Sequence, residues 1–255
     1  MEKELLLGSS FSLDSSKKCF IIGSGPSIKD QNLKLIRGHQ LIFLNNMFVH
    51  EDLISLCDYN DVYLLAAPLH PPQSREEWRS WLKEMNQKVP SSVKLIFGLS
   101  DYKDNVKSII EENNLFKNHA IRYYLPYYYF SANKISFDFD KFVSLASTAS
   151  VYAIMFSIYS SVKEVYLLGI DHSYILYENT SEMRYYSSAK HQKNEEERCQ
   201  ETADFSACRH FFKSTAEIIT QYELLGVNDV QIYSISKSTL LKSFPIVDLE
   251  TMSLV

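Results

Sequence analysis

Two apolar runs, far apart in the chain, each end at a glycine followed by polar residues, and this pair of strand ends constrains the fold most. The first run, 19–22, leads into the loop GSGPS at 23–27, and the second, 165–168, leads into GID at 169–171. In a parallel α/β sheet, residues at the carboxyl ends of the strands line the ligand crevice. We therefore expect the two ends to form two sides of one site.

Short β-rich apolar runs alternate along the chain with longer amphipathic runs. The expected strands are Lys18–Ile22, Gln40–Leu44, Val62–Ala66, Val93–Phe97, Ile121–Leu125, Glu164–Leu168 and Val230–Ser234. The expected helices are Gln31–Ile36, Arg75–Asn86, Asn105–Asn114, Ser150–Tyr159 and Phe205–Leu225, the last ended by Gly226. Near-continuously apolar strands between helices predict a mostly parallel sheet with helices on both faces. We expect a Rossmann-like α/β fold with a lid insertion.

The length and composition predict one large domain. With 255 residues, of which 45% are hydrophobic and 22% charged, the chain can bury a substantial core. The run 174–208 is polar, and a polar connection of this length inside a compact domain is typically a functional lid or disordered. Because this run contains Tyr177, Tyr185 and Tyr186, we favour the lid, and we expect a single domain over 1–255 with 174–208 as that lid.

The charge and the cysteines narrow the class of function and the location. A net charge of −5 gives no overall electrostatic footprint for nucleic acid, so we expect no nucleic-acid partner. The four cysteines form no CxxC pair, which favours a reducing cytoplasm. No apolar window reaches the length of a membrane span. We expect a cytoplasmic protein, with peripheral association with the inner membrane and oligomer formation left open.

The loop GSGPS suits a phosphate or ribose, because glycines let the backbone approach a ligand while serine hydroxyls and main-chain amides donate to it. It is not the dinucleotide pattern GxGxxG, since Ile28 stands where the third glycine belongs, and no GKS or GKT follows that would make it a P-loop. The alternative is a tight strand-to-helix turn with Ser27 as the helix cap.

Paired asparagines, Asn45 and Asn46, follow the second expected strand. A side-chain amide can bond a base edge or a sugar hydroxyl through both its donor and its acceptor. Asparagine is also a favoured turn and cap residue, so a purely local role remains open.

Five blocks occur in an order that carries a family resemblance. They are GSGPS at 23–27, Asn45-Asn46, TASVY at 148–152, KEVYLLGID at 163–171 and IYSISKSTLL at 232–241. Over residues 18–245 the chain resembles the bacterial sialyltransferases of glycosyltransferase family 42 and related capsule and lipopolysaccharide biosynthesis proteins. The resemblance implies a Rossmann-type fold and an inverting transfer of sialic acid, or a related keto-sugar acid, from a CMP-linked donor. It also implies a glycan or glycolipid acceptor, a histidine base, and no metal or other cofactor.

The resemblance also implies a donor site. Its loop, 23–27, would meet the nucleotide, while Tyr174 and Tyr185 or Tyr186 would contact the leaving phosphate. The full set of donor-binding residues that we expect is Gly23, Ser24, Gly25, Pro26, Ser27, Asn45, Asn46, Thr148, Ser150, Gly169, Asp171, Tyr174, Tyr185, Tyr186 and Ser238. The arginine that the family carries just before its TSG-like block is Ala146 here, which leaves open whether sialic acid is the sugar of the donor or of the acceptor.

Three histidines compete for the role of general base. His191 lies in the polar run ahead of the last helix and corresponds best in order to the lid histidine of the family. His172 follows Asp171 directly and could bind donor or acceptor instead, and His210 falls within an expected helix, where a structural histidine is common. A neutral imidazole suits the removal of a proton from a hydroxyl, because histidine titrates near neutral pH. We rank His191 first, with His172 and His210 as alternatives.

Two further patterns are more typical of ordinary structural roles. Asp138 and Asp140 have the DxD spelling of metal-dependent glycosyltransferases, but a three-letter match is common, and we expect no metal. Trp78 and Trp81, three residues apart on an expected helix, favour core packing over a sugar platform.

Two other classes of function remain open. Archaeal-type pterin diphosphokinases share the GxGPS block and transfer pyrophosphate from ATP, which requires magnesium. A non-catalytic nucleotide-binding protein of a capsule complex would bind the ligand without turnover.

Overall fold

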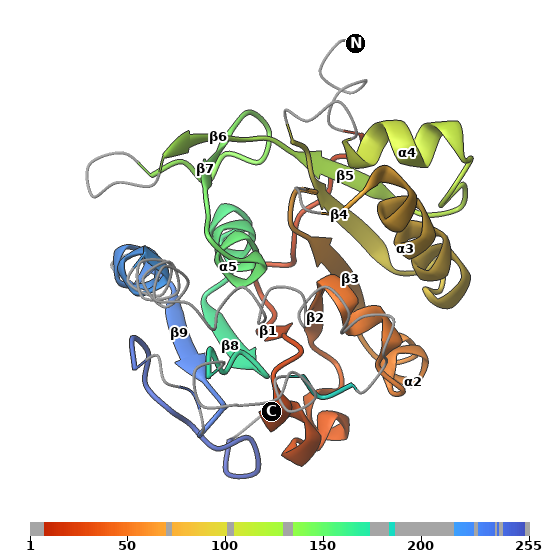
Figure 1. The fold of residues 1–255 in the computed structure, drawn as a ribbon. Coiled ribbons are helices and arrows are strands. Elements are labelled where there is room, and N and C mark those ends of the chain that lie inside the picture. The colour runs from red at the N-terminus through yellow and green to blue at the C-terminus, as the bar shows by residue number, and fades with distance from the viewer. Residues whose placement is uncertain are drawn as a thin grey trace, which may run out of the picture.

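The computed structural model describes residues 8–69, 73–100, 105–129, 135–173, 184–186, 217–226, 229–237, 239 and 242–252. Its centre is a seven-stranded sheet in which every pair of neighbouring strands is parallel (Figure 1). The strands are β1 (Cys19–Ile22), β2 (Gln40–Leu44), β3 (Asp61–Ala66), β4 (Lys94–Gly98), β5 (Ile121–Tyr124), β8 (Glu164–Leu168) and β9 (Gln231–Ser234). The expected Rossmann-like α/β fold and its seven strands are confirmed, with ends that differ by one residue at most.

The order of the strands in space is β5-β4-β3-β2-β1-β8-β9. From β1 the chain builds outward to β5 on one side, and later returns to place β8 and β9 on the other. The order reverses between β1 and β8, and ligands of open α/β sheets bind outside the carboxyl ends of the strands at such a switch point. The two strand ends that the sequence singled out therefore flank the switch point.

Alternating side chains of each strand enter two separate cores. Phe20 and Ile22 of β1 pack in one core, whereas Cys19 and Ile21 pack in the other. The first core also receives α2 (Leu53–Cys57), α3 (Arg75–Lys88) and α4 (Val106–Glu112). The second receives α5 (Ala149–Tyr159) and the helical residues 217–225. Helices on both faces of the sheet are confirmed.

The helices differ in how they are fixed. Nearly every residue of α5, from Ala149 to Ser157, is buried, as expected for a helix that is apolar all round and lies across the middle of the sheet (Figure 1). In contrast, α3 buries only one stripe, and its first turn is held by a capping box between Ser74 and Glu77. Figure 1 shows α3 and α4 side by side near the β4 and β5 strands.

The connection after β1 differs from the prediction. In place of a helix over Gln31–Ile36 there are two short 3-10 turns, η1 (Pro26–Asp30) and η2 (Leu33–Ile36). Pro26 starts the first turn, and the extended backbone of Gln31 ends it, before the Asn32 side chain caps the second by accepting from Lys34 N.

Several other elements were not expected. A 3-10 turn, η3 (Asn45–Val49), directly follows β2, and α2 follows η3. The tyrosine-rich run after β5 turns at Pro126 into β6 (Pro126–Tyr129), which pairs in parallel with β7 (Val143–Leu145) in a second, two-stranded sheet. Tyrosine has a high β propensity, and Pro126 at the first strand position needs no ladder donor.

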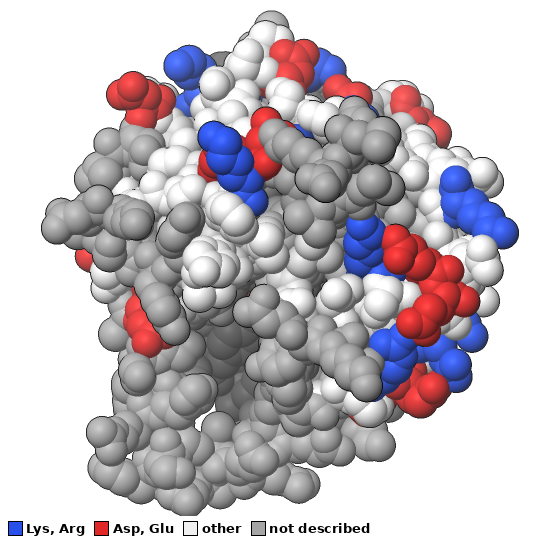
Figure 2. Space-filling view, turned by 90° about the horizontal axis from the view of Figure 1, so that it is seen from above, with Lys and Arg blue, Asp and Glu red and all other residues white. Residues whose placement is uncertain are grey.

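The surface of the described residues carries charges of both signs. On the face shown in Figure 2, basic and acidic groups interleave. The exposed ion pairs of α3 and α4, such as Arg75 with Glu112 and Arg79 with Glu76, follow the same pattern. In the part of the chain that the structure describes, no helix combines the length and apolar character needed to span a membrane.

Candidate functional site

The loops after β1 and β8 touch through their main chains at the switch point. Gly23 N donates to Leu168 O at 2.8 Å, and Gly25 N donates to Gly169 O at 2.8 Å. A Cβ placed on Gly169, whose φ is +59°, would lie 2.3 Å from Gly23 O, and one placed on Gly23 would lie 2.6 Å from Gly169 O. Glycine is therefore required at both strand ends, because no larger residue fits between the two backbones.

Asp171 joins the ends of three strands. Its carboxylate accepts from Ser27 N at 2.9 Å, from Ser27 Oγ at 2.5 Å, and from Ser236 Oγ, which follows β9. The side chain is 3% exposed, so these bonds replace its hydration. In this structure Asp171 organises the loops around the switch point. The role as a ligand contact that the resemblance implies for it stays a prediction.

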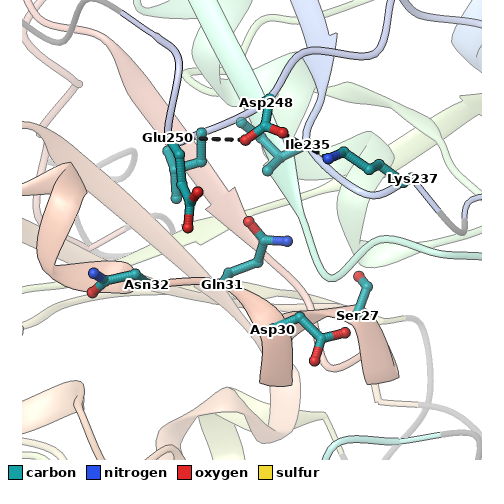
Figure 3. Close-up of a pocket in the computed structure, with 9 residues that line it drawn as sticks. Ser27, Asp30, Gln31, Asn32, Ile235, Lys237, Asp248 and Glu250 are labelled. Atoms are coloured by element: carbon teal, nitrogen blue, oxygen red, sulfur yellow. Dashed lines mark hydrogen bonds and ion pairs between the residues drawn. The ribbon is translucent and has the colours of Figure 1, made fainter.

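Ser27 also lines a cavity of about 270 Å³ (Figure 3). Figure 3 shows Ser27, Asp30 and Gln31 of the β1–β2 connection on one side, and Asp248 and Lys237 from the segments after β9 on the other. Lys237 Nζ and Asp248 Oδ2 form an ion pair at 2.6 Å. The remaining lining residues are Asn32, Ile235, Leu249 and Glu250. Ser27, which lines the cavity and also binds Asp171, connects the cavity with the switch point.

Both expected asparagines lie at the end of β2, but their amides contact protein groups. Asn45 has a left-handed φ of 47°, and its Oδ1 accepts from Ala67 N, just beyond β3, at 3.1 Å. Asn46 Oδ1 accepts from Trp81 Nε1 of α3 at 2.6 Å, and Asn46 Nδ2 donates to Tyr186 Oη at 3.0 Å. Asn45 therefore has the turn conformation that the sequence left open, and Asn46 connects three segments.

The expected tyrosines reach the same place. Residues 184–186, the described part of the expected lid 174–208, form a short segment that we call the tyrosine strap. Tyr185 N donates to Ser24 O at 3.0 Å, and the Tyr185 ring lies 5.0 Å from the His50 ring. The strap thus contacts the loop after β1, and through Tyr186 it also contacts the end of β2.

The Tyr185 hydroxyl has a distinctive environment. It is buried, and no described residue gives it a hydrogen-bond partner. Burial, together with the nearby Tyr186 and Glu51, raises the pKa of Tyr185, so the phenol stays protonated and can act as a hydrogen-bond donor at neutral pH. A buried hydroxyl with no partner costs free energy, which a ligand acceptor would recover.

A chain of polar groups runs from the end of β8 to the start of α5. His172 Nε2 lies 2.9 Å from Tyr222 Oη, Tyr222 Oη lies 2.6 Å from Ser150 Oγ, and Ser150 Oγ lies 2.5 Å from Thr148 Oγ1. The structure thus brings together three of the expected residues, joined by Tyr222, which belongs to none of the five sequence blocks. Gln221, the neighbour of Tyr222, binds Ser147 through both ends of its amide, at 3.0 and 3.1 Å.

His172 is the described member of the three candidate bases. Burial lowers the pKa of His172 to about 4; Asp171 opposes this shift, and Arg184 adds to it. The imidazole is therefore neutral at physiological pH, which is the state that a base requires. The backbone of His172 is left-handed, with φ 49°, a conformation that histidine adopts more readily than most residues.

Four expected site residues, His191, His210, Tyr174 and Ser238, lie outside the described residues. The DxD residues take part in ion pairs: Asp138 with Lys141 at 3.1 Å, and Asp140 with the buried Arg122 at 3.0 Å. Within the described ranges, no group of three or more His, Cys, Asp and Glu residues is arranged to hold a metal ion.

Besides Tyr222, two further partners of the expected residues were missed, Ser236 and Trp81. Ser236 lies inside the block IYSISKSTLL, so that block could have pointed to it. Trp81 was assigned to core packing, and it does lie edge-on to Trp78 at 5.7 Å, but its indole N–H also binds Asn46. No sequence pattern pairs a helix residue with a strand end in this way.

Comparison with known proteins places this fold among solved structures. A scan against protein-family models finds no match, and a search of curated protein sequences finds none either. In structure, the chain is similar to the monofunctional α-2,3-sialyltransferase Cst-I from Campylobacter jejuni, with a TM-score of 0.54, 14% identity, and coverage of 98% of this chain and 87% of that one.

The second similar structure is the sialyltransferase CstII from Campylobacter jejuni in complex with cytidine-5'-monophosphate, with a TM-score of 0.52, 16% identity, and coverage of 95% and 89%. The third is CST-II with a trisaccharide acceptor and CMP, with a TM-score of 0.50, 20% identity, and coverage of 92% and 89%. At these identities the likeness establishes the fold. The family resemblance read from the five sequence blocks is thereby confirmed at the level of the fold.

Proposed function

We propose that the chain is a glycosyltransferase that moves sialic acid, or a related keto-sugar acid, from a CMP-activated donor to a hydroxyl of a glycan or glycolipid acceptor. The observation that carries the proposal is the meeting of the GSGPS loop with the end of β8 and with the tyrosine strap at one switch point. The proteins of similar fold support the ligand class, because two of them are described with CMP and one of these with a trisaccharide acceptor.

The chemistry of such a transfer suits the residues at the site. Departure of a nucleoside monophosphate needs hydrogen-bond donors aimed at the phosphate, where negative charge develops. The Tyr185 hydroxyl, protonated and without a described partner, fits that role, and Tyr186 lies beside it, with ring centroids 5.2 Å apart. These donors would act without a metal. We propose that transfer inverts the anomeric centre, as the resemblance implies.

The acceptor hydroxyl must lose its proton to a base. We keep His191 as the first candidate and His210 as an alternative. The contact of His172 Nε2 with Tyr222 favours a different task for His172, that of fixing the hydroxyls of Ser150 and Thr148 beside the donor. We further propose a cytoplasmic enzyme of surface-polysaccharide synthesis, which could meet a lipid-linked acceptor at the inner membrane.

A thermal-shift series tests this proposal. CMP should raise the melting temperature without added metal, because a ligand that binds only the folded state stabilises it. UDP and GDP, each with manganese, should have little effect. Stabilisation by ATP with magnesium, and none by CMP, would instead identify a diphosphokinase-type transfer.

Turnover needs a separate assay. Wild-type protein with CMP-sialic acid and a panel of glycan acceptors should release CMP faster than without acceptor. Binding of CMP with no release from any donor would support the non-catalytic alternative. Replacing His191 by Ala should lower turnover by roughly 10²–10⁴-fold with CMP affinity little changed, which is the usual contribution of a positioned base.

A further inference from the structure

Trp81 contacts the candidate site from outside it. The residue belongs to α3, yet its indole Nε1 lies 2.6 Å from Asn46 Oδ1 at the end of β2. An indole N–H can only donate, so the atom of Asn46 that faces it must be the carbonyl oxygen. If the amide were turned over, two donors would face each other, which would leave both without an acceptor. Trp81 therefore fixes the orientation of the Asn46 amide, with Oδ1 toward the indole and Nδ2 away from it.

The orientation of Asn46 determines the contact with the strap. With its oxygen held by Trp81, Asn46 presents Nδ2 to Tyr186, and Nδ2 donates to Tyr186 Oη at 3.0 Å. Tyr186 is thus the acceptor in this bond, and its own hydroxyl proton is directed away from Asn46. Tyr186 is 8% exposed, so its side chain is largely shielded from bulk water.

The indole is itself held firmly. Its ring lies edge-on to Phe48, a buried residue of η3, with centroids 5.9 Å apart, and edge-on to Trp78. Phe48 and Asn46 belong to the same short turn, so Trp81 contacts this turn twice, once through its ring and once through its N–H. The strap has a second anchor, the main-chain bond from Tyr185 N to Ser24 O, so exchange of the Tyr185 amide reports whether the strap stays in place.

We infer that Trp81 is a positioning residue: through Asn46 it sets the hydrogen-bond direction of Tyr186 and holds the tyrosine strap against the end of β2. This inference rests on the proposed function, in which the strap tyrosines donate to the phosphate of a CMP-linked sugar. It adds a determinant of nucleotide affinity that lies on α3, outside the loops after β1 and β8.

Two variants test the hold on the strap without any nucleotide. Trp81→Phe keeps a ring against Phe48 and loses the N–H, whereas the matched control Trp78→Phe changes the neighbouring indole and leaves the Asn46 bond in place. Amide exchange of Tyr185, followed by NMR, should accelerate roughly five- to twentyfold in Trp81→Phe, the factor expected for loss of one hydrogen bond. It should stay within about twofold of wild type in Trp78→Phe. Equal exchange in both variants would overturn the inference.

A third variant tests the direction of the bond. Asn46→Asp can still accept from Trp81 but can only accept from Tyr186 as well, so the Tyr186 hydroxyl must turn to donate toward it. We expect the strap to remain in place while CMP affinity, measured by calorimetry, falls at least about tenfold, as a donor to the phosphate is lost. Wild-type affinity in Asn46→Asp would show that direction has no role. If wild-type protein itself does not bind CMP, the proposed function fails, and the exchange experiment still decides the role of Trp81.

Discussion

The two strand ends that the tyrosine strap connects are built in opposite ways. At the end of β1, the loops of Gly23 and Gly169 meet backbone to backbone, with space for no side chain between them. At the end of β2, Asn46 makes its contacts through an amide that has two possible orientations, one of which is selected by Trp81. The first geometry is a property of the main chain and tolerates no substitution. The second depends on which atom donates and which accepts, so a substitution that exchanges one donor for an acceptor can change it.

The largest effect is expected where the backbones meet. Gly169→Ala would place a Cβ 2.3 Å from Gly23 O at a residue whose φ is +59°. Since both the overlap and the left-handed backbone oppose alanine, we expect the free energy of unfolding to fall by about 3 kcal/mol or more. Urea denaturation measures this change.

Gly38→Ala is the control for backbone conformation alone. Gly38 has a φ of +83°, and no atom lies within 4 Å of the position that a Cβ would take there, so only the conformational cost of about 1–2 kcal/mol applies. Equal destabilisation by the two substitutions would mean that the close approach of the two loops contributes nothing.

A smaller effect, dependent on pH, is expected at His172. Its folded-state pKa is about 4, against an ordinary value of 6.5, so between these values the unfolded chain binds a proton that the folded protein does not. The free energy of unfolding should therefore fall as the pH decreases from 6.5 to 4, with about 1–3 kcal/mol attributable to this residue.

His172→Asn removes the titrating group and tolerates the left-handed φ of 49°. Its unfolding free energy should decrease less between pH 6.5 and 4 than that of wild type. Burial also lowers the pKa of His50, so His50→Asn serves as the comparison for a second buried imidazole. An identical pH dependence of wild type and His172→Asn would contradict the burial of a neutral His172.

The smallest effect is expected at the end of β2, where side chains make the contacts. Asn45→Gly allows the left-handed backbone, with φ 47°, and loses the bond to Ala67 N. We therefore expect the free energy of unfolding to fall by about 0.5–1.5 kcal/mol. Asn45→Ala should cost about 1 kcal/mol more, because alanine resists that backbone conformation. Thermal denaturation of the pair measures the difference, and a glycine variant less stable than the alanine variant would rule out a backbone origin.

The sheet could be predicted from the sequence, because each buried strand is marked by an apolar run of a few consecutive residues. The apolar runs of β1, β2 and β8 are buried on both faces, and such runs are typical of central parallel strands. The sequence predicts the switch-point glycines for the same reason, since a glycine directly after a buried strand indicates a tight turn or a close approach of two backbones. The expected helix over 31–36 fails because Pro26 and Asn32 divide the segment into two short turns.

The partners of the site residues are harder to predict. Ser27 meets Asp171 across 144 residues of sequence, and Trp81 meets Asn46 across 35. Both bonds depend on how helices and loops pack against the sheet, and no local sequence pattern predicts that packing. The sequence could therefore name Asp171 and Asn46, but not the protein groups that hold them.

The strand order also bears on how the chain acquires its structure. The strands from β1 to β5 pair with neighbours that are close in sequence, so this half of the sheet can assemble while later residues are still being synthesised. The bonds of Asp171 close a loop of 144 residues, a separation that makes this step slow and late. We expect chains truncated before β8 to be collapsed and resistant to mild proteolysis, yet unable to bind a nucleotide. The switch point would then be the last part of the protein to form.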